Sequence, residues 1–181
     1  MANLIDKTYF IGEINIAQLS QQAVRDNLTV FIGKREPEYL EKALGYAFYQ
    51  EFLAGLTADV QKWKDIRDGA EYTNEDGFTK KWKGLTNTDK ISPIANYIYY
   101  WFSRDLVTFS TGTGEKEGKS DNAGNTSSIL KQTRAYNEMV DMTLQLQDFL
   151  LNKKDDAGAL VYDTFDIDQV TVMKKANFLN L

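Results

Sequence analysis

The stretch 92-SPIANYIYYWFSRDLVTF-109 decides the fold of this chain. Ser92 is a good helix-capping residue, and Pro93 suits the first helical position because its missing N–H would have no partner there. The apolar side chains that follow recur at helical spacing and form one broad, largely aromatic face: Ile94, Ile98, Trp101, Phe102, Leu106 and Phe109. We therefore expect a helix over 93–109 at the centre of a helical bundle.

Two helices are expected before this central one. A pattern like a capping box begins at Asn15, and the apolar face that follows is expected to end at the stop signal Gly33. A second helix opens at Glu36-Pro37 and ends at Gly55, and Gly45 inside it is suited to a close helix crossing. The short link predicts that the two helices pack antiparallel.

The remaining elements follow from local patterns. A short helix is expected over 57–67, and a small β-hairpin over about 70–83, with Asp76-Gly77 as its turn. Residues 111–128 are small and polar, which predicts a long flexible loop. A last helix is expected over 128–152.

The chain divides into a helical bundle domain, 1–154, and a C-terminal arm, 155–181. The arm holds β-favouring residues but is too short to form its own core. It must pack on the bundle, pair with a strand or dock on a neighbouring subunit. The expected fold class is mainly α: a bundle of four to five helices with a small β-hairpin and a β-prone C-terminal tail.

The composition excludes several kinds of chemistry. The 181 residues include no histidine and no cysteine, so disulfides, thiolate nucleophiles and histidine-based triads are excluded. The net charge of −5 argues against broad electrostatic binding to nucleic acid. No run of 18 apolar residues occurs and the first residues lack a signal-peptide pattern, so we expect neither a membrane span nor a secretory signal.

Two motifs resemble ligand sites but do not fit them. Residues 113–120, TGEKEGKS, resemble a phosphate-binding P-loop, but Thr113 stands where glycine is needed and no strand is expected before it. Asp163, Asp166 and Asp168 suggest calcium, yet the glycine and glutamate of an EF-hand loop are missing. A loop and an exposed polar tail are the preferred interpretations.

A Lys-Trp-Lys motif occurs twice, at Lys62-Trp63-Lys64 and at Lys81-Trp82-Lys83. Basic residues beside an aromatic ring can bind single-stranded nucleic acid. Residues 57–84, however, hold six acids and six bases, so the region is neutral. Buried tryptophans with lysines facing solvent are the better interpretation.

Other candidate residues also have ordinary structural interpretations. Glu38, Glu41 and Glu51 are possible catalytic carboxylates, but a solvated helix face is the default. The tyrosines of 97–100 are suited to stacking a ligand, although a core role is commoner. The prediction is therefore no catalytic, cofactor-binding or metal residue, no cofactor and no enzyme activity.

The layout of the whole chain resembles a family of head–tail connector, or adaptor, proteins from phages and prophages of Bacteroides-type bacteria. The segments that carry this resemblance are 4–14, Glu38–Leu53 (EYLEKALGYAFYQEFL), Tyr97–Phe102 (YIYYWF) and Lys174–Leu181 (KKANFLNL). The resemblance implies a helical adaptor that forms a homo-oligomeric ring next to the portal. Its implied partners are portal and tail or neck proteins, with DNA only as passing cargo and no membrane.

The resemblance also implies a place in the virion, and in the host cytoplasm during assembly. An acidic wall agrees with it, since such a wall repels DNA and lets it slide. Two alternatives stay open: a bacterial cytoplasmic protein-binding module with no phage role, and a small carboxylate-dependent enzyme. The enzyme would need a pocket with convergent acids of shifted pKa.

Overall fold

The structure, a computed structural model, describes residues 3–111, 114–117 and 128–177 and is mainly helical. The helices of this part are α1 (Gln22–Leu44), α2 (Tyr46–Thr57), α3 (Gln61–Asp68), α4 (Pro93–Val107) and α5 (Ser128–Asn152). The strands are β1 (Ala70–Thr73), β2 (Thr79–Trp82), β3 (Thr108–Thr111) and β4 (Gly114–Glu117). Short 3-10 helices are η1 (Lys7–Tyr9), η2 (Gly12–Ile14) and η3 (Ile167–Gln169). The predicted mainly α bundle with a small hairpin is confirmed.

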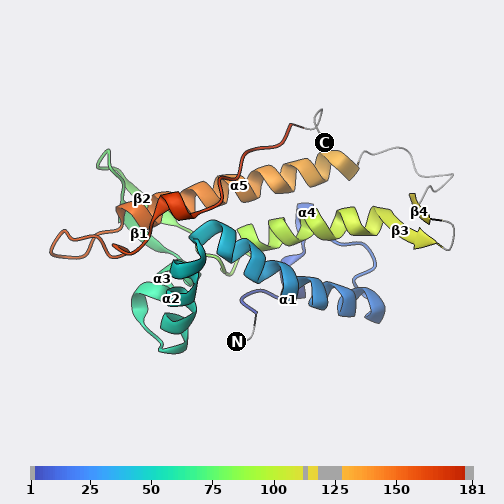
Figure 1. The fold of residues 1–181 in the computed structure, drawn as a ribbon, viewed down its shortest axis with the longest axis horizontal. Coiled ribbons are helices and arrows are strands. Elements are labelled where there is room, and N and C mark those ends of the chain that lie inside the picture. The colour runs from blue at the N-terminus through green and yellow to red at the C-terminus, as the bar shows by residue number, and fades with distance from the viewer. Residues whose placement is uncertain (1–2, 112–113, 118–127, 178–181) are drawn as a thin grey trace.

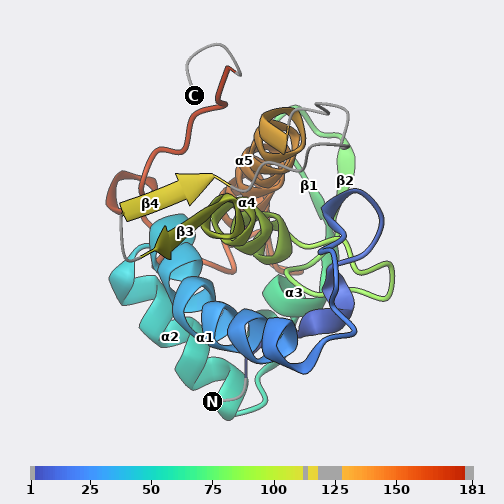
Figure 2. The same cartoon turned by 90° about the vertical axis from the view of Figure 1, so that its right-hand side faces the viewer.

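Helix α4 lies at the centre of the bundle, between α1 and α5 (Figures 1 and 2). Its apolar face is fully buried at Ile94, Ile98 and Phe102. Phe102 meets Phe31 of α1 edge to face, with ring centroids 5.3 Å apart. The aromatic face read from the sequence therefore organises the core.

The predicted break at Gly33 is wrong, because α1 runs unbroken from Gln22 to Leu44. Pro37 lies inside this helix and removes the N–H that would bond the Gly33 carbonyl. Gly33 is exposed, so water can satisfy that carbonyl and the helix continues. The predicted start at Asn15 is also wrong, since Gln18 has a positive φ of 60° and α1 begins only after it.

Gly45, expected inside a helix, instead separates α1 from α2. Its φ of 77° and ψ of 150° place it in a region of backbone conformation that only glycine adopts readily. A Cβ at this position would also approach the Gln169 carbonyl oxygen to 3.2 Å. The predicted antiparallel pair is therefore replaced by one long helix, and a shorter one follows the break.

The hairpin expected over about 70–83 is confirmed. Strands β1 and β2 pair antiparallel from Ala70 opposite Trp82 to Thr73 opposite Thr79. Gly77 takes a φ of 82° in the connecting turn. Phe78, which directly precedes β2, is exposed. The hairpin thus packs through Trp82 and through Tyr72 of β1.

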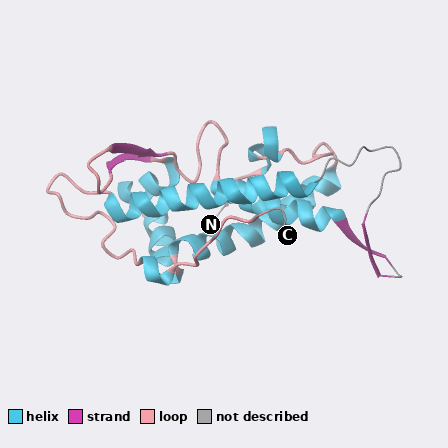
Figure 3. Ribbon diagram, turned by 90° about the horizontal axis from the view of Figure 1, so that it is seen from above, coloured by secondary structure: helices cyan, strands magenta, loops and turns pink. Residues whose placement is uncertain are grey.

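Residues after α4 form a second hairpin instead of the predicted helical end and loop. Strands β3 and β4 pair antiparallel, with Thr108 opposite Glu117. Residues 112–113 and 118–127, most of the loop predicted over 111–128, lie outside the described residues. The two hairpins lie at opposite ends of the bundle (Figure 3).

The described part of the C-terminal arm packs on the bundle, the first of its three expected placements. Tyr162 and Phe165 are buried against Phe48 of α2, with ring centroids 6.2 and 5.2 Å away. Farther along, the Asn137 side chain of α5 exchanges two hydrogen bonds with the backbone of Ala176. The β-favouring residues of the described arm form no named strand, because the aromatic contacts fix a path along the helices.

Candidate functional site

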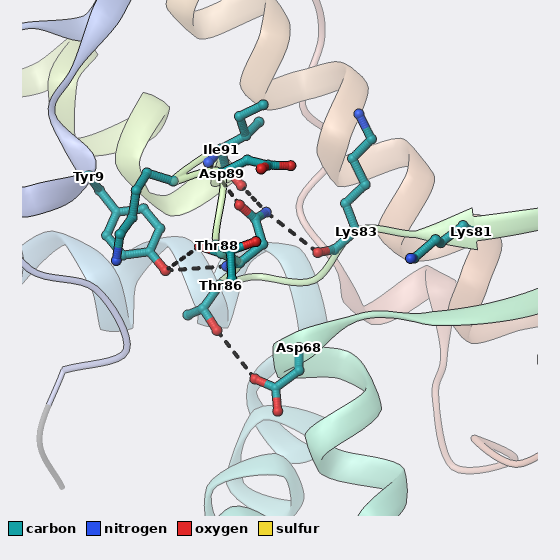
Figure 4. Close-up of a pocket in the computed structure, with 10 residues that line it drawn as sticks. Tyr9, Asp68, Lys81, Lys83, Thr86, Thr88, Asp89 and Ile91 are labelled. Carbon is teal, nitrogen blue, oxygen red and sulfur yellow. Dashed lines mark hydrogen bonds between the residues drawn. The ribbon is translucent and has the colours of Figure 1, made fainter.

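A groove beside the loop that precedes α4 is the candidate site (Figure 4). It has a volume of about 610 Å³. Four segments line it: η1, the end of α3, the end of β2 and the loop itself. We call it the lysine groove after the side chains at its edge; its lining residues are Tyr9, Asp68, Lys81, Lys83, Thr86, Asn87, Thr88, Asp89, Lys90 and Ile91.

The loop of the groove is held in shape by Asn87. The Asn87 side-chain oxygen accepts the N–H of Ile91 at 3.0 Å. Its amide nitrogen donates to the carbonyls of Ile91 and Lys83, at 2.5 and 3.4 Å. The Asn87 side-chain amide thus bridges Lys83 and Ile91 and holds the loop between them in shape, although the loop has no regular secondary structure.

Tyr9 forms the opposite wall, 78 residues away in the sequence from Asn87. The Tyr9 hydroxyl accepts the Asn87 N–H at 3.3 Å and lies 3.5 Å from the Asn87 carbonyl oxygen, to which it donates. The Lys90 ammonium lies 4.5 Å from the centre of the Tyr9 ring. This cation–π contact holds Lys90 over the wall of the groove.

The floor is a close contact between the end of α3 and the loop. Gly84 has a φ of 91°, and a Cβ there would come within 2.6 Å of the Arg67 carbonyl oxygen. The N–H of Thr86 donates to the same carbonyl at 2.8 Å. Only glycine permits this approach of two backbones, so the floor depends on Gly84.

The charges of the groove are unevenly balanced. Two hydrogen bonds of 2.7 Å from Arg67 hold the pKa of Asp68 below its usual value, although partial burial opposes the shift. Asp68 is therefore neutralised by Arg67. Lys81 and Lys83 are exposed and have no ion pair among the described residues. The free charge of the groove is positive at the β2 edge, which suits carboxylates.

The groove continues into a neighbouring hollow of about 820 Å³, which shares Tyr9, Thr86 and Lys90 with it. In the groove, the Thr86 hydroxyl donates to the Asp68 carboxylate at 3.4 Å, and that carboxylate is also held by Arg67. Among the described residues there is no group of three or more acids that could hold a metal ion. The arrangement is suited to binding a charged surface.

The two Lys-Trp-Lys motifs match the packing interpretation. Trp63 and Trp82 are both buried in the core. Trp82 is 1% exposed and its ring stacks on Phe149, with ring centroids 6.5 Å apart, so its face is not free to stack a base. The lysines beside Trp82 line the groove, and those beside Trp63 do not.

The candidate carboxylates have separate partners and do not converge. Partial burial alone would raise the pKa of Glu38, but hydrogen bonds from Lys42, Arg35 and Tyr97 lower that pKa to about 2. Such a carboxylate stays ionised at neutral pH and is a poor proton donor. Glu51 accepts instead from the Thr164 hydroxyl of the arm at 2.8 Å, and Glu41 is exposed on α1.

The other sequence candidates also lack a ligand-site geometry. Gly114–Glu117 forms strand β4, not a phosphate-cradling loop, and residues 113 and 118–120 lie outside the described part. Asp163, Asp166 and Asp168 are exposed along the arm. The tyrosines of 97–100 are buried and belong to the packing around α4.

A buried carboxylate, Glu36, has no counterpart in the sequence-based predictions. It accepts the backbone N–H groups of Leu4 and Ile5 at 2.8 and 3.1 Å. Burial raises its pKa, although these two hydrogen bonds oppose the shift. Glu36 therefore ties the N-terminal segment to α1. No local sequence pattern predicts this contact, because Ile5 and Glu36 are 31 residues apart in the chain.

Comparison of the chain with known protein families, with curated proteins and with solved structures finds no match. Within the described residues, none of the helices has both the length and the apolar character to cross a membrane.

Proposed function

We propose that this chain is a structural virion-assembly protein, a head–tail connector subunit that forms a ring next to the portal. The observation that supports this proposal is the C-terminal arm. The arm runs along the outside of the bundle with little regular structure, and it leaves apolar side chains such as Leu160, Ile167 and Val172 exposed. Ile167 and Val172 line one hollow with the exposed Leu144 of α5, and a contiguous exposed apolar patch is typical of surfaces that bind another protein.

The charge distribution also suits a ring through which DNA passes. The chain carries a net charge of −5, and the C-terminal arm, 155–181, carries −3 of it, so the face that holds the arm repels phosphate. A passing duplex then slides along the wall instead of sticking to it. Portal and tail or neck proteins are the proposed partners, in the virion and in the host cytoplasm during assembly.

The test is the solution mass of the full chain by light scattering, alone and with the portal protein of the same genome. The proposal predicts a portal-bound assembly that holds many copies of the chain. A portal protein from an unrelated phage is the control and should leave the mass unchanged. A chain whose mass ignores its own portal would contradict the proposal.

A protein-binding module without a phage role is the second candidate, and the lysine groove favours it. Such a module would bind an acidic peptide through Lys81 and Lys83 and ignore the portal. An aspartate-rich peptide is expected to bind this groove in both cases, so the light-scattering mass with the portal separates the two functions.

A further inference from the structure

The C-terminal arm carries much of the acidic charge of the chain. Residues 155–181 include five aspartates and two lysines, Lys174 and Lys175, which gives the arm a net charge of −3. The five aspartates all precede the two lysines, so the stretch 155–173 holds only acidic charges. The five side chains are exposed and none has an ion pair within the described ranges: Asp155, Asp156, Asp163, Asp166 and Asp168.

The lysine groove carries the opposite charge. Residues 79–91 include four lysines and one aspartate, a net charge of +3. Lys80 is already paired with Asp148 at 3.0 Å, so it offers nothing to a partner. Lys81 and Lys83 remain for an acidic segment, with Lys90 on the far wall.

Each of the two surfaces also exposes an apolar side chain among its charges. Ile91 lines the groove next to Lys90 and is 48% exposed. Ile167 lies on the arm between Asp166 and Asp168 and is 40% exposed. An apolar centre with charged residues around it is the usual composition of a protein interface, and here the two charge patterns are complementary.

The two surfaces lie on opposite sides of one molecule. Figure 2 shows the loop before α4, in yellow-green, on one side of the bundle, and η3 with the following arm, in red, on the other. The arm of a chain is held on its own bundle by Tyr162, Phe165 and Asn137, far from its own groove. Contact between arm and groove therefore requires a second copy.

We propose that the arm of one copy docks in the lysine groove of the next copy, head to tail. The docking segment is the exposed edge around Asp163, Ile167 and Asp168, and its receptor is Lys81, Lys83 and Ile91. A contact between two different surfaces leaves each copy with one free arm and one free groove, so the contact repeats and closes into a ring when the rotation permits. This inference rests on the proposed function, because it names the subunit contact of the proposed ring.

A zero-length carbodiimide cross-linker tests the contact directly, since it joins a carboxylate to an amine only when they touch. Full-length chains with natural and heavy nitrogen isotopes are mixed before the reaction. The proposal predicts peptides that join Lys81 or Lys83 to Asp163 or Asp168, with about half of them carrying one light and one heavy partner. Links confined to chains of a single isotope would overturn it.

A charge exchange gives the second test, by sedimentation velocity in low salt. K81E/K83E makes both surfaces of the contact acidic, and D163K/D168K makes both basic. Each variant alone should associate about tenfold more weakly than the wild type. An equal mixture of the two should associate again, because each arm then meets a groove of opposite charge.

The first Lys-Trp-Lys motif supplies the matched control. K62E/K64E makes the same charge change beside a buried tryptophan outside the groove, and it should associate like the wild type. Association that ignores both groove and arm variants, or a chain that is monomeric at every concentration, overturns the head-to-tail contact. Portal binding in the light-scattering experiment would leave the connector function standing even then, so failure of the contact and failure of the function are distinguishable.

Discussion

The Lys-Trp-Lys motif occurs twice in the chain, once in α3 and once at the end of β2, with different results. In the first motif, residues 62–64, the leading lysine lies 4.7 Å above its own tryptophan ring and the trailing lysine pairs with Asp59 at 2.7 Å. In the second motif, residues 81–83, both lysines line the groove and have no ion pair in the described part of the chain. The two tryptophans are alike, since both are buried.

The difference shows which property of a motif a sequence determines. Burial of the tryptophan follows from its own large apolar surface, so it is the same at both positions. The role of a lysine depends on which acids the fold places beside it. Asp59 lies three residues before the first motif and pairs with its second lysine. The second motif faces a groove in which Asp68 is already paired with Arg67 and therefore does not pair with a lysine.

The largest expected effect tests the property that the two motifs share, the burial of their tryptophans. Trp82→Ala and Trp63→Ala should each lower the free energy of unfolding by about 3–5 kcal/mol, because each leaves a cavity in the aromatic core. Urea denaturation followed by circular dichroism measures both losses. A loss well below 1 kcal/mol for Trp82→Ala would mean that this ring serves a surface contact.

Gly55 of α2 gives a way to disturb the first tryptophan alone. A Cβ at Gly55 would come within 1.8 Å of the Trp63 ring, so Gly55→Ala should destabilise the chain by about 1–3 kcal/mol. Gly33→Ala is the matched control, because its nearest neighbour would be 4.0 Å away. That substitution should stabilise α1 by up to about 1 kcal/mol. Destabilisation by Gly33→Ala would contradict the continuous helix.

Glu38 sharpens the contrast between paired and unpaired charges. Its pKa is lowered from 4.5 to about 2, so its contribution to stability is complete above pH 4.5 and is lost as the pH falls through 2. Glu38→Gln should cost about 1 kcal/mol at pH 7 and flatten the stability profile between these two pH values. Glu41→Gln, at an exposed position of the same helix, is the control and should change neither. An unchanged profile for Glu38→Gln would show that the ion pairs contribute nothing.

The smallest expected effect concerns the lysines of the two motifs. K81E/K83E should change the free energy of unfolding by only about 0.5 kcal/mol, because these exposed side chains form no ion pair within the described residues, although Glu71 lies opposite Lys81 in the hairpin. K62E/K64E should cost about 0.5–1 kcal/mol, since it replaces the Asp59 ion pair by repulsion. Thermal unfolding of both variants in one buffer measures the difference. The reverse order of the two losses would mean that the second motif is the one built into the fold.

Much of the fold follows from local sequence patterns. The aromatic face of α4, the span of α5 and the turn at Gly77 are encoded in residues close together in the chain, so periodicity and turn chemistry predicted them. The predicted start and end of the first helix were wrong, because contacts with distant parts of the chain decide where α1 begins and ends. Gly33 was expected to end a helix and Gly45 to lie inside one, whereas in the structure α1 continues through Gly33 and ends before Gly45, which has a φ of 77° and lies against Gln169 of the arm.

The groove was not predictable, because its walls come from distant parts of the sequence. Nothing near Tyr9 indicates that its hydroxyl will bond the backbone of Asn87. The five aspartates of residues 155–168 can be counted in the sequence, but their place on the far side of the bundle depends on Tyr162 and Phe165 packing against α2. Charge patterns are thus readable from the sequence, and their relative positions are not.

The most direct test is the light-scattering mass of three full-length chains, each with the portal protein of the same genome: wild type, K62E/K64E and K81E/K83E. We predict that the wild type and K62E/K64E form the same large assembly with the portal, while K81E/K83E leaves most of the chain monomeric. Equal masses for the two variants would contradict the claim that the lysines of the second motif, and not those of the first, join one subunit to the next.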